Sequence, residues 1–383
     1  MGRIDVRRID WVLLAALCGI MLLGLLSVSH ATGAQPGVPA TWSTAARQAA
    51  FMLVALLVGL GVALVDPQLF AGYRRPLYVF NLILLLAVRV IGVESGGAER
   101  WIALGPLSFQ PSEFAKLLLV VTLASLLSER AEQGLTWREF FLVGMYALIP
   151  MVLVLLQPDL GTSLVFIVIT IAMLYMAGFS GRLLAGLAVA GLGAAAAVIT
   201  LQMRFGLDFP LKQYQIRRLI VFTDPYRYAA TGGYQIIQSE IAIGSGREWG
   251  YGLFNPSHAT YVPAGHTDFI FANVGSQLGF AGGALLLALY ALLMYRALRI
   301  AGRVEQSFAS LLIVGVVAML AFQVFVNIGM ASGIMPVTGI PLPLMSVGGS
   351  AVATDIIGIA LIEGVAIHQH ETMFGAVRQT RSR

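Results

Sequence analysis

The sequence predicts an all-α polytopic membrane protein with about ten transmembrane helices and one large extracytoplasmic loop. Three observations support this fold class. Hydrophobic residues make up 58% of the 383 residues and charged residues only 11%, whereas soluble domains carry about 25% charged residues. Apolar runs close to the length that a bilayer requires recur along the chain. Arginines gather in alternate connections between these runs, as the positive-inside rule describes.

The apolar runs define the predicted spans. The first run follows a short basic head and resembles a signal peptide with a cleavage site near Ala31. We favour an uncleaved span, because many more runs follow. The ten runs lie near residues 11–28, 46–65, 77–93, 112–128, 141–156, 160–178, 182–202, 270–295, 308–330 and 345–367. Residues 1–383 are predicted to form a single transmembrane domain, with 203–269 as its large extracytoplasmic loop.

The distribution of basic residues predicts that both termini are cytoplasmic. With the N-terminus inside, the short outer loops contain only Arg47 and Arg100. The inner connections and tails then contain Arg3, Arg7, Arg8, Arg74, Arg75, Arg130, Arg138, Arg182, Arg296, Arg299, Arg303, Arg378, Arg381 and Arg383. An even number of spans requires that the two ends lie on the same side.

Composition also excludes several classes of function. The single cysteine, Cys18, lies inside an apolar run, so neither a disulfide framework nor a thiolate metal site is expected. No dense basic run is mixed with aromatic residues, which argues against nucleic acid as a partner.

The clearest candidate site is the stretch His266-Thr267-Asp268, which closes the large loop. An imidazole and a carboxylate two residues apart at a membrane surface indicate function. The structural alternative is that these residues cap the helix that follows.

A second polar group is predicted near the outer ends of two other spans. Glu113 and Lys116 share a helix face, either as an ion pair that locks two helices or as the polar wall of a substrate site. Asp159 joins two apolar runs and either caps the following helix or adds a third carboxylate. Arg100-Trp101 is either an interfacial anchor or part of the same site.

The large loop is basic and partly amphipathic. Tyr234 to Ile243 is predicted to form a short helix on the membrane surface. Arg217 and Arg218 would bind either anionic lipid headgroups or the pyrophosphate of a lipid substrate, and the pattern alone does not separate these alternatives.

Polar residues also occur in the last two spans. Gln323 and Asn327 share a helix face, and their side chains are predicted to form hydrogen bonds to another helix. The segment 336–350 contains three prolines and three glycines, which indicates irregular backbone at membrane depth. Asp355 follows within the last span and is a better functional candidate than Glu363, which lies near the inner end.

Several of these segments, in this order, resemble motifs of the SEDS family (shape, elongation, division and sporulation) of bacterial cell-wall proteins. The form of 339–343 resembles the RodA, cell-elongation branch more than the FtsW, division branch. The matching segments are Arg100-Trp101, 109–116, 157–163, 233–246, 266–272, 339–343 and 348–350.

The resemblance implies a peptidoglycan glycosyltransferase of the bacterial inner membrane. It would polymerise lipid II, an undecaprenyl-pyrophosphate-linked substrate, with a class B penicillin-binding protein and the elongation machinery as partners. Asp268 matches the essential aspartate of the family and would be the general base. The residues expected to bind substrate or support catalysis are Glu113, Lys116, Asp159, Trp101, Arg100, His266, Thr267, Arg217, Arg218, Gln238 and Ser350. Lys116, Arg217, Arg218 or a divalent cation, Mg²⁺ or Mn²⁺, would stabilise the leaving pyrophosphate, and no other cofactor is expected.

The chain departs from the family pattern at four places. Ser276-Gln277 replaces a pair of glutamates, Glu240 replaces a lysine, Val347 replaces a tyrosine and Asp355 replaces an asparagine. Two other functions therefore stay open: a transporter or flippase for lipid II, and a catalytically idle scaffold for a penicillin-binding protein.

Overall fold

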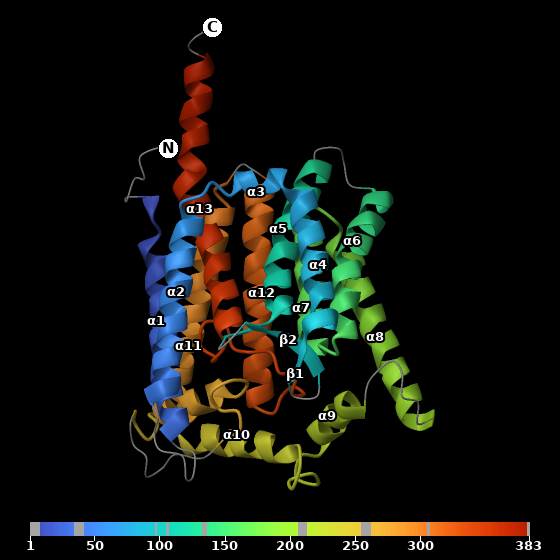
Figure 1. Ribbon diagram of the computed structural model, residues 1–383, viewed down its shortest axis with the longest axis vertical. Coiled ribbons are helices and arrows are strands. Elements are labelled where there is room, and N and C mark those ends of the chain that lie inside the picture. The colour runs from blue at the N-terminus through green and yellow to red at the C-terminus, as the bar shows by residue number, and fades with distance from the viewer. Residues whose placement is uncertain are drawn as a thin grey trace.

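The computed structural model describes residues 8–33, 42–95, 98–104, 107–131, 136–205, 213–253, 262–304 and 307–380. Long helices dominate these residues (Figure 1). The helices are α1 (Trp11–Gly33), α2 (Trp42–Ala63), α3 (Gln68–Gly72), α4 (Arg74–Ile91), α5 (Pro111–Ala131), α6 (Trp137–Leu156), α7 (Leu160–Met176), α8 (Gly181–Phe205), α9 (Gln213–Thr223), α10 (Gly233–Ser245), α11 (Ile270–Ala301), α12 (Ser307–Ala331) and α13 (Gly349–Thr380). The chain is thus the all-α polytopic membrane protein that its composition predicts.

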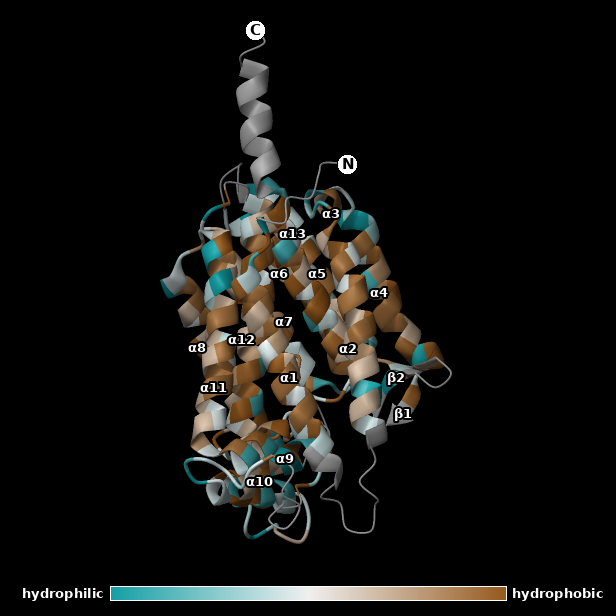
Figure 2. Cartoon of the chain, turned by 90° about the vertical axis from the view of Figure 1, so that its left-hand side faces the viewer, coloured by the Kyte–Doolittle hydropathy of each residue, from teal (hydrophilic) through white to brown (hydrophobic). Residues whose placement is uncertain are grey.

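Ten of the helices correspond to the ten predicted spans. Eight of them are long and apolar enough to cross a membrane by length and composition. The other two are α7, which is apolar but has 17 residues, and α4, whose 18 residues include three arginines, Arg74, Arg75 and Arg89. Figure 2 shows the long helices mainly in hydrophobic colours, with hydrophilic residues gathered toward the two ends.

The bundle has a buried centre and an exterior of mainly apolar side chains. Helices α5 and α12 and the first part of α13 are mostly buried, while α8 is exposed along nearly its whole length. Helix α2 packs along α13, and α1 packs along α11. Exposed side chains on the outer helices are largely aliphatic and aromatic, as expected where lipid replaces water.

The large loop forms a layer across one end of the bundle. Helices α9 and α10 lie there, opposite the end where α3 and the last turns of α13 are found (Figure 1). The predicted short helix at 234–243 is present as α10, whereas α9 had no counterpart in the sequence prediction. The loop begins slightly later than predicted, because α8 continues to Phe205.

A small antiparallel sheet interrupts the helical pattern between α4 and α5. Its strands are β1 (Val93–Ser95), β2 (Ala98–Leu104) and β3 (Leu107–Phe109), in the order β1-β2-β3. Trp101 pairs with Val93, and Ile102 pairs with Phe109. The strands carry the chain to Pro111, where α5 begins.

Helix α11 is broken in its N-terminal third. Gly279 has φ 62° and ψ −159°, a conformation that essentially only glycine adopts. The loop after α10 bridges the break: Phe280 and Ala281 donate their N–H groups to the carbonyls of Arg247 (2.8 Å) and Glu248 (3.0 Å). Tyr251 and Gly252 donate in turn to Ser276 and Gln277, at 3.0 Å each. The broken helix therefore keeps these backbone groups hydrogen-bonded.

Candidate active site

Asp268 lies in the turn that leads into α11, and it does not cap that helix. The N-cap residue is Phe269, and no side chain caps the helix there. The capping alternative for His266 and Asp268 is therefore wrong. Instead, the carbonyl of Asp268 accepts a hydrogen bond from the Asn327 amide at 2.8 Å. The same amide nitrogen donates to the carbonyl of Ile340, also at 2.8 Å.

The irregular segment before α13 holds the rest of this turn. Ser346 donates its hydroxyl to the carbonyl of Thr267 at 2.7 Å, and Val347 donates its N–H to the carbonyl of His266 at 2.9 Å. The segment thus fixes the backbone of all three candidate residues together with Asn327. Residues 342–346 of this irregular backbone are buried in protein, and 336–339 are half-buried.

A guanidinium from α9 faces the Asp268 carboxyl across Gly339. Gly339 has φ 79°, and a Cβ atom there would lie 3.7 Å from both Arg218 Nη1 and Asp268 Oδ2. Arg218 is anchored by donating to the carbonyls of Thr338 (3.1 Å) and Val337 (3.3 Å). The large loop and the 336–348 segment therefore meet at the candidate general base.

The charges around Asp268 decide its proton affinity. Burial raises the pKa of the Asp268 carboxyl above its usual range, and Arg218, Arg100 and His266 act against that rise. Burial lowers the pKa of His266, Arg47 lowers it further, and Asp268 acts in the opposite direction. The carboxyl is thus a stronger proton acceptor than an ordinary aspartate, beside an imidazole that is harder to protonate than usual.

The Glu113–Lys116 pair lies in the buried part of α5. Lys116 Nζ is 2.9 Å from Glu113 Oε2, and the two side chains are only 1% and 3% exposed. With its amide oxygen turned toward the ammonium, Gln323 on α12 accepts a further hydrogen bond from Lys116 at 2.6 Å. The pair joins α5 to α12, as the locking alternative proposed.

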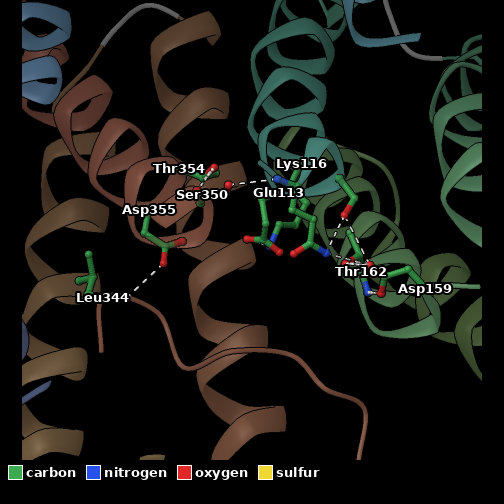
Figure 3. A network of polar contacts seen from close by, with 10 residues as sticks. Glu113, Lys116, Asp159, Thr162, Leu344, Ser350, Thr354 and Asp355 are labelled. Atoms are coloured by element: carbon green, nitrogen blue, oxygen red, sulfur yellow. Dashed lines mark hydrogen bonds and ion pairs between the residues drawn. The ribbon is translucent and has the colours of Figure 1, made fainter. Parts of the chain in front are cut away.

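Asp159 caps α7 and also contacts the start of α5. It accepts from the Thr162 N–H at 3.1 Å and from the Thr162 hydroxyl at 2.9 Å. Ser112 and Gln110 donate to the same carboxylate at 3.4 Å each. Figure 3 shows this cluster beside the Glu113–Lys116 pair. The prediction that Asp159 caps the following helix is confirmed. Its carboxylate is also part of the polar group around the first turn of α5.

Ser350 links this polar group to α13. Its hydroxyl accepts from the Gln110 N–H at 3.1 Å and donates to the carbonyl of Ser108 at 3.4 Å. The start of α13 is thereby fixed against β3 and the residue preceding α5.

The remaining candidates lie on three different elements. Trp101 is half-buried in β2, Arg217 is exposed on α9, and Gln238 is half-buried in α10. Ser239, next to Gln238, donates to the carbonyl of Ala331 at 2.6 Å and so docks α10 on the end of α12.

Sequence reasoning missed Gln48 as a part of the site. This amide in α2 is 1% exposed, donates to the carbonyl of Ser346 at 3.1 Å and accepts from the Gly348 N–H at 3.4 Å. A lone glutamine at the start of an apolar run was the available signal, since such residues inside membranes usually bond another element.

The described part of the chain has no cluster of three or more His, Cys, Asp or Glu side chains suited to a metal ion. The carboxyl of Asp268 is surrounded mainly by cations. A divalent cation would therefore need Asp268 as one ligand and phosphate oxygens of a substrate for most of the others, which is a common arrangement for Mg²⁺.

Comparisons with known proteins match nearly the whole chain to one family. A family model for the FtsW, RodA and SpoVE group, described as "Cell cycle protein", matches residues 8–371. The chain is 36% identical over 372 residues to the peptidoglycan glycosyltransferase MrdB of Escherichia coli K12, covering 96% of each chain. It is 34% identical over 354 residues to a probable peptidoglycan glycosyltransferase FtsW of Saccharophagus degradans, covering 90% of this chain and 89% of the relative.

Solved structures show the same fold. The rod shape determining protein RodA of Thermus thermophilus aligns with a TM-score of 0.70 at 30% identity, over 94% of this chain and 98% of that one. A chain from a peptidoglycan synthase complex, reported as coordinating polymerization and crosslinking, aligns with a TM-score of 0.78 at 32% identity, over 95% and 99%. This chain belongs to the FtsW/RodA/SpoVE family, the group that the sequence motifs indicated.

Proposed function

We propose that this protein is a peptidoglycan glycosyltransferase that polymerises lipid II, with Asp268 as general base. The observation that carries the assignment of the site is the partly buried Asp268 carboxyl, whose pKa is raised and which faces Arg218 across Gly339. Relatives with peptidoglycan glycosyltransferase names cover nearly the whole chain, so the assignment does not rest on a fragment.

The reaction forms one C–O bond and breaks another. The Asp268 carboxylate takes the proton from the acceptor sugar hydroxyl as that oxygen attacks the anomeric carbon of the donor. The bond between the anomeric carbon and the pyrophosphate oxygen breaks, and the electron pair leaves with the lipid pyrophosphate. Arg218 and Arg100 lie near enough to Asp268 to affect its charge, and guanidiniums bind phosphate oxygens well. They would stabilise the leaving group.

The buried Lys116 is assigned a supporting role. It is already bonded to Glu113 and Gln323. We propose that this triad, with Asp159, shapes the outer ends of α5 and α7 beside which the substrate binds. Asp268 would hold the predicted Mg²⁺ or Mn²⁺, which would offset the negative charge of the leaving pyrophosphate. Chelation with EDTA and addition of each ion test this prediction.

We propose that the chain lies in the bacterial inner membrane with both termini in the cytoplasm, and works with a class B penicillin-binding protein in cell elongation. Two findings support this. Helix α1 begins, and helix α13 ends, at the end of the bundle opposite α9 and α10 (Figure 1). A similar chain occurs in a peptidoglycan synthase complex.

The test is glycan-chain formation from purified lipid II, measured for the protein alone, with its class B penicillin-binding protein, and as Asp268→Asn with that partner. Polymer that is lost in the variant supports the proposal. Equal polymer from Asp268→Asn would show that the chain is a scaffold for another enzyme. No polymer with the partner and divalent cations would reject the proposal, and a lipid II flipping assay would then examine the transport alternative.

A further inference from the structure

Asp355 is a buried carboxyl that the reaction described above does not use. It lies in α13, is 1% exposed, and stands within a membrane-spanning segment. Ionisable groups at such depth are costly and are retained for a purpose. Lys116, the nearby cation, is already paired with Glu113, so a salt bridge does not explain Asp355.

The carboxyl of Asp355 stabilises a strained turn. Its Oδ2 atom accepts a hydrogen bond from the N–H of Leu344 at 3.2 Å (Figure 3). Leu344 has φ 64°, in the left-handed region that is unfavourable for a non-glycine residue. Leu344 is itself 1% exposed, so water would not replace this acceptor if the carboxyl were removed.

The same turn holds the residues around Asp268. Ser346 accepts from the Leu342 N–H at 2.8 Å and donates to the carbonyl of Thr267 at 2.7 Å. Val347 donates to the carbonyl of His266 at 2.9 Å. The path from Asp355 to the residues before Asp268 thus consists of one hydrogen bond, a turn of four residues and two further hydrogen bonds.

We propose that Asp355 is a positioning residue, which fixes the turn at Leu344 and thereby the backbone that carries Asp268. The proposal rests on the proposed role of Asp268 in catalysis, and adds to it a dependence on a residue of another helix. It requires an acceptor oxygen at position 355 and does not require a negative charge there.

An asparagine at position 355 would satisfy that requirement. Its amide oxygen would accept from Leu344, and its amide nitrogen would replace Oδ1, which has no partner among the described residues. A leucine of similar size would provide no acceptor.

The experiment compares Asp355→Asn, Asp355→Leu and the control Thr354→Val in the full-length protein. Thr354 is buried on the same helix, but among the described residues its hydroxyl bonds only to the carbonyl of Ser350 one turn earlier. Two quantities are measured: backbone hydrogen exchange of peptides covering 264–269 and 342–347, and kcat and KM for lipid II with the partner present.

We expect Asp355→Leu to speed exchange in both peptides and to lower kcat by about tenfold or more, the change that about 1.4 kcal/mol at the transition state produces. KM should change little. Asp355→Asn and Thr354→Val should match the parent protein in exchange and in kcat. An unchanged exchange rate at 264–269 in Asp355→Leu, or loss of kcat in Asp355→Asn equal to that in Asp355→Leu, would overturn the proposal.

A second variant covers the case in which Asp355→Leu does not fold. Ser346→Ala removes the bond between the turn and Thr267 and leaves the Asp355 carboxyl in place. It should raise exchange at 264–269, and unchanged exchange there would also overturn the proposal. Hydrogen exchange does not depend on catalysis, so a failure of the proposed glycosyltransferase activity would be visible separately as absent polymer from the parent protein.

Discussion

The proton affinity of Asp268 depends on single charges that can be removed one at a time. Burial raises the pKa of this carboxyl, and Arg218 is the strongest influence in the opposite direction. A general base must be deprotonated, so the rate should fall as the pH decreases through the pKa of Asp268. Because that pKa lies above the ordinary aspartate value, the loss should begin at a higher pH than an unperturbed carboxyl would give.

Arg218→Gln should move this acid limb of kcat/KM to higher pH. The substitution removes a cation that favours the carboxylate, so the pKa of Asp268 should rise further. The matched control is Arg217→Gln, since Arg217 is the preceding residue of α9 but is exposed. An equal shift of the acid limb in both variants would contradict a specific role of Arg218 and point to net charge alone.

The Glu113–Lys116 pair makes a different residue-scale prediction, on stability. Lys116→Met leaves the Glu113 carboxylate buried without its cation, which typically costs about 3–5 kcal/mol. The double variant Glu113→Leu with Lys116→Met should recover most of that loss, because no buried charge remains. Thermal unfolding of the purified proteins in one detergent measures both. A double variant less stable than Lys116→Met would contradict the interpretation.

At the scale of elements, hydrophobicity predicted the helices well and polar residues predicted the site only in part. The ten apolar runs became ten helices, because a segment in lipid must satisfy its own backbone hydrogen bonds. The small sheet before α5 was missed because its strands are short. Helix α9 was missed although its apolar residues recur at helical spacing. A cap was one of the two roles that the position of Asp159 suggested, and the structure shows that cap.

The contacts between distant segments could not be predicted from the sequence. Asn327 was interpreted as a bond between helices, yet its amide holds the backbone of Asp268 and Ile340. Arg218 was a candidate because of its charge, and its place opposite Asp268 depends on how α9 folds over the 336–348 segment. These contacts follow from packing of the whole chain, which local patterns do not encode.

Substitution by alanine should affect stability differently at two glycines near the break in α11. A Cβ atom at Gly279 would lie 2.5 Å from the backbone nitrogen of Gly250, and the backbone conformation there disfavours any other residue. Gly279→Ala should therefore destabilise the protein clearly. At Gly283 the nearest atom to a new Cβ is 3.6 Å away, on the ring of Phe271, so Gly283→Ala should be neutral or stabilise by up to about 1 kcal/mol. Thermal unfolding of the pair compares them directly.

At the scale of the whole molecule, a labelling experiment can test the proposed orientation in the membrane. Trp137 at the start of α6 and Trp249 after α10 are both exposed, at 60% and 78%. In a Cys18→Ser background, Trp249→Cys should react with a membrane-impermeant thiol reagent in intact cells, and Trp137→Cys only after the membrane is opened. The reverse pattern would show that the proposed orientation is inverted.

The backbone bridge across the break in α11 has a consequence for sequence drift. Arg247 and Glu248 contribute their carbonyl groups to it, and Tyr251 contributes its N–H. The Glu248 side chain is exposed, whereas the backbone of Arg247 has φ 49°, a conformation that favours glycine or asparagine. Homologous proteins should thus tolerate a wide choice of residues at position 248 and a narrower one at position 247, while the glycines at 250 and 279 stay fixed. A stretch that looks poorly constrained residue by residue would still preserve one of the most constrained backbone paths in the molecule.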